Sequence, residues 1–328
     1  MKVLIYYEKA DLKPVGGPAG YLYNLYNEIL KQNITEIEFL NSKKSKIDNC
    51  FRFLFNKMPV RIRELYYNKK KKQYGMSLYN RIFDSRKRIA KINLNEYDIV
   101  HFHSTEMMYM VKDSLLDYRG KVILTSHSPK VLFKEKIDGI PHTEYIKNKE
   151  MFENLEVMDE YAFNRADYII FPCKDAEEPY YNSWKKYKDI HFKNKDKYIY
   201  LPTGINKVNI YNDKDSIRKR YNIPQNAFVI SYVGRHNEVK GYFKLKELGE
   251  KILARNNDVY FLIAGKQGDT KPLNNERWIE IGWTKHPHDY IAASDLFILP
   301  NKETYFDLVL LEVLSIRSKS INNKYRRK

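Results

Sequence analysis

The stretch SYVGRHNEVKG, residues 231–241, places two cations around a loop that ends in glycine. Arg235 and Lys240 lie in this loop, between an apolar run and the start of a helical pattern. A helix N-terminus offers unpaired backbone N–H groups, and with two cations these meet the needs of a bound diphosphate. We predict a phosphate-binding loop here, which Gly265 and its neighbours repeat after the next apolar run. A solvated basic loop is the alternative, because lysines occur throughout the chain.

A second chemical feature is Glu312, which interrupts the apolar face of the segment LPNKETYFDLVLLE, residues 299–312. A carboxylate on such a face is costly unless it accepts hydrogen bonds, and the vicinal hydroxyls of a ribose are suitable donors. Glu312 is therefore a candidate ligand of a nucleoside. The alternative is a helix glutamate that pairs with a nearby cation.

The N-terminal half contains a glycine loop of its own, in which Gly16 and Gly17 stand between an apolar run and a helical pattern. Such a loop lets a ligand approach backbone N–H groups and is a possible anion site. A plain turn that needs positive φ explains the same residues equally well. The spacing is not the GxGxxG of dinucleotide-binding proteins.

Histidines follow two further apolar runs: His101 and His103 in IVHFHS, and His127 in ILTSHS. Ligands of α/β folds bind at the carboxyl ends of parallel strands, so His127 is expected to contact substrate. His101 and His103 share one face of their strand, and His101 is expected to pack in the core. A metal pair is an alternative for which the sequence offers no third ligand.

Short apolar runs alternate with helical patterns along the whole chain, which predicts an α/β protein with buried parallel strands. A turn at Pro202–Ile205 separates two such sets, so we expect two doubly wound domains. Residues 41–75, rich in Arg, Lys, Tyr and Phe, are expected at an exposed edge. The predicted strands are Val3–Tyr7, Ile37–Leu40, Ile99–Phe102, Val122–Thr125, Tyr168–Phe171, Tyr198–Leu201, Phe228–Val233, Val259–Ala264 and Leu296–Leu299.

Taken in order, VGRHNEVKG, IAGK and PNKETYFDLVLLE resemble the donor half of family 4 glycosyltransferases, which have the GT-B fold. GGPAGYLYNL, ILTSHS, FPC and YLPTGI resemble the remaining family motifs, so the resemblance covers nearly the whole chain. It implies two Rossmann-like doubly wound domains facing a cleft: an acceptor-binding domain, 1–208, and a nucleotide-sugar-binding domain, 209–316. It also implies retention of anomeric configuration without a metal or cofactor, the nucleoside diphosphate sugar being the donor substrate.

The resemblance assigns roles residue by residue. Catalytic roles go to His127, Glu303 and Thr304, donor binding to Gly17, Arg235, Lys240, Gly265 and Glu312, and acceptor binding to Gly16 and His103.

Two departures from the family pattern affect this assignment. The family's paired glutamates have seven residues between them, whereas Glu303 and Glu312 have eight, so Thr304 is expected to replace the first glutamate. The second departure is the stretch 317–328, RSKSINNKYRRK, which is basic and has no strand pattern. We expect an aberrant tail after a truncated, incomplete second domain, with an unpaired sheet edge after Ile316. Weak activity, or an inactive remnant, would follow.

The overall composition narrows the partners and the compartment. The chain has 58 Lys and Arg against 41 Asp and Glu, a net charge of +17, which indicates an anionic partner or a lysine-rich genome. Its two cysteines lie far apart, and it contains neither a signal peptide pattern nor an apolar stretch of membrane-spanning length, so a cytoplasmic enzyme is expected. The basic stretch Arg61–Lys72 would allow peripheral attachment to the inner face of the cell membrane.

The function expected from these features is hexosyl transfer, of the EC 2.4 type, to a saccharide or lipid-linked acceptor. Such an enzyme would act in the biosynthesis of a bacterial surface polysaccharide, such as capsule or lipopolysaccharide. A sugar-nucleotide epimerase is disfavoured because no dense set of histidines and carboxylates accompanies the loop. Nucleic-acid binding is disfavoured because no recognition motif is present.

Overall fold

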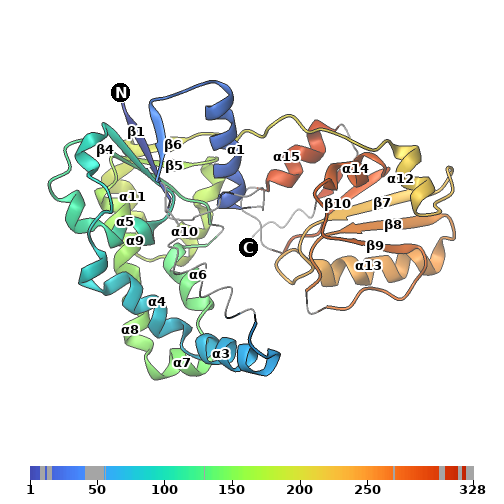
Figure 1. Ribbon diagram of the computed structural model, residues 1–328, viewed down its shortest axis with the longest axis horizontal. Helices are drawn as coiled ribbons and strands as arrows, with labels where there is room; N and C mark the ends of the chain where they lie inside the picture. Colours follow the sequence, from blue (N-terminus) through green and yellow to red (C-terminus); the bar gives the residue numbers. More distant parts are fainter. Residues whose placement is uncertain are drawn as a thin grey trace. The chain divides into compact units, whose positions relative to one another are not determined.

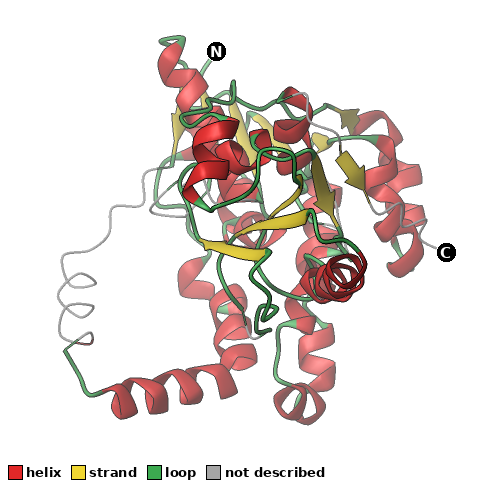
Figure 2. Cartoon of the chain, turned by 90° about the vertical axis from the view of Figure 1, so that its right-hand side faces the viewer, coloured by secondary structure: helices red, strands yellow, loops and turns green. Residues whose placement is uncertain are grey.

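The computed structural model of the protein describes residues 1–7, 12, 17–40, 55, 57–128, 130–268, 270–302, 307–316 and 320–322. The chain divides into two compact parts, Met1–Thr203 and Gly204–Lys328, which we call unit 1 and unit 2 (Figure 1). The predicted domain boundary after residue 208 lies slightly further along the chain than this division. In both units the strands are parallel, and the helices lie outside them (Figure 2).

The sheet of unit 1 has the strand order β2-β1-β3-β4-β5-β6, and every pairing in it is parallel. Its strands are β1 (Val3–Tyr6), β2 (Ile37–Phe39), β3 (Ile99–Phe102), β4 (Lys121–Thr125), β5 (Tyr168–Phe171) and β6 (Tyr198–Tyr200). Its helices are α1 (Pro18–Lys31), α3 (Val60–Lys72), α4 (Tyr74–Phe83), α5 (Thr105–Met110), α6 (Leu132–Asp138), α7 (His142–Lys147), α8 (Lys149–Glu153), α9 (Glu156–Arg165), α10 (Glu178–Ser183) and α11 (Tyr187–Asn194).

The sheet of unit 2 has the order β11-β10-β7-β8-β9, again with parallel pairing throughout. Its strands are β7 (Phe228–Val233), β8 (Val259–Ala264), β9 (Trp278–Gly282), β10 (Leu296–Leu299) and β11 (Ser320–Asn322). Its helices are α12 (Lys214–Arg220), α13 (Tyr242–Arg255), α14 (Pro287–Ala292) and α15 (Leu308–Ser315).

Each sheet has one point where the chain changes direction across it. In unit 1 the chain passes from β1 to β2 on one side and continues with β3 on the other; in unit 2 the same change separates β8 from β10 around β7. Loops on either side of such a point leave the carboxyl ends of adjacent strands in opposite directions, which opens a crevice for ligands. The topology therefore singles out the loops after β1, β3, β7 and β10.

The strands of unit 2 are covered by helices on both faces, so successive side chains along them are buried. Tyr232 and Phe261 pack toward α13 with Leu245, whereas Val229 and Leu262 pack on the other face, toward α12 and α14. Since successive side chains of a strand point to opposite faces, a continuous apolar strand requires helices on both sides. The predicted α/β class with parallel sheets is confirmed.

Two predictions about strands are wrong. The strand Trp278–Gly282 was not expected, because Glu280 interrupts its apolar residues and most of it is only partly buried. The second concerns 317–328, where no strand was expected, yet Ser320–Asn322 forms β11 and pairs with β10. Backbone N–H and C=O groups make this pairing, so a strand can form there without an apolar pattern. The edge of β10 that was expected to be unpaired is therefore paired with β11.

Within the predicted edge segment 41–75, residues 41–54 and 56 lie outside the described residues. The described part contains α3, in which no residue is buried. Arg61, Leu65 and Tyr67 are all exposed on it. The expectation of an exposed segment is confirmed for this helix.

Candidate functional site

The three predicted histidines of unit 1 lie together at the carboxyl ends of two adjacent strands. His103 directly follows β3 and His127 follows β4, and the Nδ1 atom of His103 lies 2.8 Å from Nε2 of His127 in a hydrogen bond. The ring of His101 stacks obliquely on His103, 4.2 Å between centroids, and its Nε2 is 2.7 Å from the Thr125 hydroxyl. The fold thus brings the histidines at the ends of β3 and β4 into direct contact.

Helix α1, which Gly17 caps, reaches the same place. Gly17 is the N-terminal cap of this helix, with φ of 68°, and its carbonyl accepts a hydrogen bond from the N–H of Tyr21 at 3.1 Å. The Tyr21 ring lies 4.9 Å from that of His127 and 5.8 Å from that of His103. The first turn of α1 thus places the ring of Tyr21 against the histidine pair.

These histidines are neutral at physiological pH. Burial lowers the pKa of His101 to about 3, and the neighbouring His127 adds to the shift. The pKa of His103, which is 5% exposed, is lowered well below its usual value by burial and then by the other two rings. His127 reaches solvent at its rim but is otherwise enclosed, and burial lowers its pKa to about 4. The site in unit 1 therefore offers uncharged hydrogen-bonding groups.

In unit 2 the loop after β7 is held by its backbone against the loops after β8 and β10. Gly265, after β8, approaches so closely that a Cβ there would lie 1.8 Å from the carbonyl oxygen of Gly234. Gly241 has φ of 66° and caps α13, and a Cβ on it would lie 1.9 Å from the carbonyl oxygen of Pro300. Two glycines thus let three loops meet at the point where the strand order reverses.

Hydrogen bonds complete this frame. The N–H of Lys302 donates to the carbonyl of Val239 at 2.9 Å, and the N–H of His236 donates to the carbonyl of Lys266 at 3.1 Å. In addition, the hydroxyl of the buried Tyr232 donates to the carbonyl of Arg235 at 2.9 Å. These three hydrogen bonds therefore hold the loop that carries Arg235 and Lys240 in place.

The two predicted cations have different surroundings. Arg235 is exposed. The Nζ atom of Lys240 lies 2.6 Å from Oδ1 of Asp307, and the other oxygen of this carboxylate accepts a hydrogen bond from the side-chain amide of Asn301. The side chain of Lys240 is 25% exposed, and that of Asp307 14%, so the pair is only partly open to water.

A buried histidine lies beneath the same loop. His236 stacks on Tyr242 with 4.1 Å between ring centroids and an interplanar angle of 2°, and its Nδ1 is 3.7 Å from Oε2 of Glu280. The pKa of His236 is lowered by burial, and the Glu280 carboxylate opposes the shift. Glu280 in turn accepts hydrogen bonds from the Tyr242 hydroxyl at 2.5 Å and the Trp278 indole at 2.8 Å.

Glu312 occupies α15 and accepts a hydrogen bond from a neighbouring helix. Nε2 of His288, on α14, lies 3.0 Å from its Oε2, and the Glu312 side chain is 26% exposed. An ionised carboxylate has two oxygens, so Oε1 retains its capacity to accept hydrogen bonds. The contact with His288 agrees with the interpretation of Glu312 as a paired helix glutamate, and its role as a nucleoside ligand stays a prediction.

Several predicted site residues cannot be placed. Gly16, Glu303 and Thr304 lie outside the described residues. No group of three or more His, Cys, Asp or Glu side chains among the described residues is arranged to hold a metal ion. The absence of a metal and of a cofactor stays a prediction.

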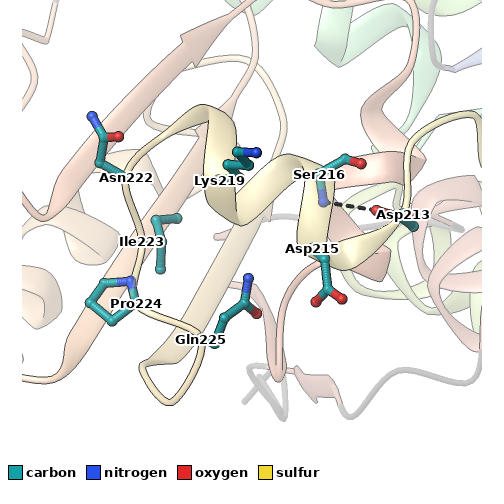
Figure 3. A pocket seen from close by; sticks show the side chains of 8 residues that line it. All are labelled: Asp213, Asp215, Ser216, Lys219, Asn222, Ile223, Pro224 and Gln225. Carbon is teal, nitrogen blue, oxygen red and sulfur yellow. Dashed lines mark hydrogen bonds between the residues drawn. The ribbon is translucent and has the colours of Figure 1, made fainter.

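A pocket of about 520 Å³ lies beside α12 (Figure 3). It is lined by Asp213, Asp215, Ser216, Lys219, Asn222, Ile223, Pro224 and Gln225, and none of these eight is a predicted site residue. The Asp213 carboxylate caps α12 by accepting from the N–H of Ser216 at 2.8 Å. Because none of its lining residues belongs to the loops after β7, β8 and β10, we do not count this pocket as part of the site.

Sequence reasoning missed Asp307, Tyr21 and His288 as members of the two sites. Asp307 had a visible signal, since a carboxylate directly before an apolar helical run occupies a capping position. Tyr21 lies four residues after Gly17 and so on the same side of the first helical turn. His288 had none, because its contact with Glu312 joins two helices that are separated by β10.

Comparison with solved structures defines the class of fold. The structure resembles sucrose-phosphate synthase from Thermosynechococcus elongatus with a TM-score of 0.58 at 15% identity, covering 98% of this chain and 80% of that one. HepE of Anabaena, solved in complex with UDP and glucose, gives 0.55 at 12% identity and covers 99% and 81%. WaaG, a glycosyltransferase involved in lipopolysaccharide biosynthesis, gives 0.55 at 12% identity, covering 98% and 80%. The predicted GT-B fold of glycosyltransferases is confirmed.

A family match covers the segment of unit 2 that contains the predicted phosphate-binding loop. Residues 227–319 match the family described as Glycosyl transferases group 1. Over 122 residues the chain is 30% identical to the putative teichuronic acid biosynthesis glycosyltransferase TuaC of Bacillus subtilis strain 168. That alignment spans 36% of this chain and 31% of the relative. The resemblance to family 4 glycosyltransferases is thereby confirmed.

One further finding bears on the membrane. Among the helices that the structure describes, none combines the length and the apolar character needed to cross a bilayer.

Proposed function

We propose that this protein transfers a hexosyl group from a nucleoside diphosphate sugar to a saccharide or lipid-linked acceptor in the biosynthesis of a bacterial surface polysaccharide. The observation that carries the proposal is the loop 234–241, held between β7 and α13 at the reversal point of the sheet in unit 2. Arg235 and Lys240 stand on this loop beside the first N–H groups of a 14-residue helix. Charge and helix direction both favour a diphosphate there.

In this proposal the cations act on the leaving group. Breaking the bond to the sugar leaves negative charge on the nucleoside diphosphate, and Arg235 and Lys240 stabilise that charge as it develops. Asp307 holds Lys240 in position before the donor binds, since the two side chains are 2.6 Å apart. Glu312, with Oε2 held by His288, offers Oε1 to ribose hydroxyls.

Retention of configuration, independence of metal, and hexose as the transferred sugar are parts of the proposal that the family resemblance supports. HepE is a protein of the same fold with UDP and glucose bound, which makes UDP-hexoses the first donors to try. The name of the Bacillus subtilis relative points to a cell-surface polymer as the product. His127, a neutral hydrogen-bonding group at a strand end, would contact the sugar or the acceptor.

The decisive experiment removes one cation and keeps everything else. Lys240→Ala should lower donor consumption or transfer by about 100-fold, the usual loss when one contact to a developing charge is removed. Lys251→Ala is the matched control, because Lys251 is an exposed lysine on the same helix, α13, at a distance from its N-terminus. Equal turnover of the two variants would defeat the assignment of Lys240.

Binding is measured separately from transfer in the same experiment. Thermal shift with UDP-, GDP- and ADP-sugars tests whether the wild type binds a donor and which base it prefers. Binding without any transfer would identify the alternative, a protein of this family that has kept the nucleotide site and lost the reaction. No shift with any nucleotide, together with retention of oligonucleotides on filters, would favour nucleic-acid binding instead.

The basic helix α3 supports attachment to an anionic membrane surface on the cytoplasmic side. It carries Lys69–Lys72 in its last turn, none of its residues is buried, and its charges are spread around the helix. Such a helix fits electrostatic attraction to anionic headgroups, at about 1 kcal/mol for each basic residue near the surface. Lipid-linked acceptors would be met at that surface.

A further inference from the structure

The positions of the two nitrogen atoms do not show which of them donates in the hydrogen bond between His103 and His127. Nδ1 of His103 and Nε2 of His127 are 2.8 Å apart, and a single proton must lie between them. A neutral imidazole carries one N–H and one bare nitrogen, so the direction of this bond fixes the tautomers of both rings.

The second nitrogen of His103 distinguishes the two directions. His103 is 5% exposed, and its Nε2 is buried with no hydrogen-bond partner among the described residues. If His127 donated, His103 would carry its proton on this Nε2, leaving an N–H group buried without an acceptor. Orphaned buried N–H groups are rarer in proteins than acceptors with unused lone pairs. The favoured direction therefore runs from Nδ1–H of His103 to Nε2 of His127.

The neighbouring rings keep the arrangement rigid and uncharged. His101 stacks on one side of His103 at 4.2 Å, and Tyr21 covers His127 at 4.9 Å. None of these partners is a carboxylate that would draw a second proton onto either ring. Burial lowers the pKa of His127 to about 4, so the pair stays neutral at the pH of the cytoplasm.

We propose that His103 is a positioning residue: its Nδ1–H fixes His127 as the Nδ1–H tautomer and so makes His127 a hydrogen-bond donor to its substrate. The proposal rests on the proposed function for the identity of that substrate, whose hydroxyl and phosphate oxygens are acceptors. It replaces direct acceptor binding, predicted for His103 from the sequence, since a side chain this buried has little surface to offer. It also gives the contact proposed for His127 a direction, with His127 as the hydrogen-bond donor.

The test is nitrogen NMR of the whole protein labelled with ¹⁵N-histidine, with resonances assigned by single histidine variants. Two-bond nitrogen–proton correlations should show His127 protonated at Nδ1 and bare at Nε2, and His103 likewise. A wild-type His127 protonated at Nε2 would overturn the proposal. This measurement needs no substrate, so its outcome is independent of the fate of the proposed function, which Lys240→Ala tests.

Two variants of His103 separate positioning from simple support of the fold. His103→Asn keeps an N–H donor near the place of Nδ1, so His127 should keep its Nδ1–H signature. His103→Leu has no donor, and His127 should show both tautomers. Transfer should fall about tenfold or more in the leucine variant, as is usual when a partner that orients a reactive side chain is lost, and the asparagine variant should recover most of it. An equal loss in both variants, with His127 unchanged in the spectrum, would contradict a positioning role.

Discussion

Two glycines that cap helices with a similar φ differ in ψ, which is -153° at Gly17 and 22° at Gly241, and in their surroundings. Gly17 in unit 1 and Gly241 in unit 2 both have positive φ, 68° and 66°, and each precedes a 14-residue helix at the reversal point of its sheet. A Cβ on Gly241 would lie 1.9 Å from the carbonyl oxygen of Pro300, whereas one on Gly17 would meet no atom of the described chain within 4 Å. Gly241 therefore lies against the backbone of a second loop, whereas the described chain leaves space beside Gly17.

The two regions also differ in the charge of their side chains. At the carboxyl ends of β3 and β4 in unit 1 stand neutral, stacked histidines, while Lys240, beside Gly241 in unit 2, forms an ion pair with Asp307. The region in unit 2 fixes charges, and the region in unit 1 holds buried, uncharged hydrogen-bonding groups. In the function proposed above, the first would hold an anionic donor and the second would contact the sugar or the acceptor.

The largest effect should come from filling the closed glycine. Gly241→Ala adds a Cβ that overlaps the backbone of Pro300 and forces an L-residue into positive φ, so unit 2 should lose about 3 kcal/mol or more of stability. Gly17→Ala meets only the conformational cost, about 1 to 3 kcal/mol. Calorimetry of both variants, with Gly204→Ala as the control at an uncrowded glycine, measures the difference. Similar losses at both positions would show that the contact with Pro300 has no energetic importance.

The neutral histidines should make the stability of unit 1 sensitive to acid. The pKa of His127 is lowered to about 4, so below the unfolded value of about 6.5 the unfolded chain binds more protons than the folded one. Stability is complete above that value and falls as the pH drops toward 4. His127→Gln removes this term, and its loss between pH 7 and pH 5 should be smaller than that of the wild type by about 2 kcal/mol. Denaturant unfolding at both pH values checks the difference; parallel losses would mean that His127 is charged when folded.

A smaller effect is expected where unit 2 holds its cation. Asp307→Asn keeps the shape of the side chain but removes its charge, so Lys240 loses the partner that positions it, and kcat/KM for the donor should fall about tenfold. The control is Glu238→Gln, because Glu238 pairs with the neighbouring Lys302 at 2.5 Å on an exposed part of the same loop. A rise in donor affinity for Asp307→Asn would indicate instead that Asp307 competes with the diphosphate.

The smallest effect for each substituted residue is expected for vesicle binding by α3, whose lysines belong to neither candidate site. Replacing Lys69, Lys70, Lys71 or Lys72 on α3 by Gln should weaken binding to anionic vesicles by about 1 kcal/mol each, and raised salt should do the same to the wild type. Donor affinity should be unaffected in these variants. Vesicle sedimentation beside thermal shift measures the two quantities; vesicle binding that ignores salt would rule out an electrostatic attachment.

The sequence predicted most of the architecture, because central strands are apolar on both faces and leave an unbroken signal. Val259–Ala264 was predicted with the bounds that the structure has, whereas β9, at the edge and interrupted by Glu280, was missed. β11 was missed for a related reason: its pairing with β10 uses backbone groups, about which the side-chain pattern of 317–328 says nothing.

The candidate sites were predicted as positions but not as contacts. Glycines and histidines at strand ends are visible because topology brings strand ends together, so His103 and His127 could be grouped in advance. The bond between Lys240 and Asp307 spans 67 residues of sequence, and no periodicity reports such a pair. The orientation of His103 toward His127 likewise depends on packing that only the folded chain provides.

The close approach of Gly265 to Gly234 has a consequence for how this protein can change. The loops of unit 2 meet through main-chain atoms at these glycines, so their relative placement is set with no side chain in the contact. Arg235, Glu238 and Val239 project from this frame and are exposed. Of the three, only Val239 carries no charge assigned to the diphosphate or to an ion pair, so its side chain can be exchanged while the frame keeps its shape, which makes it the natural position for a library that seeks altered nucleotide-sugar specificity.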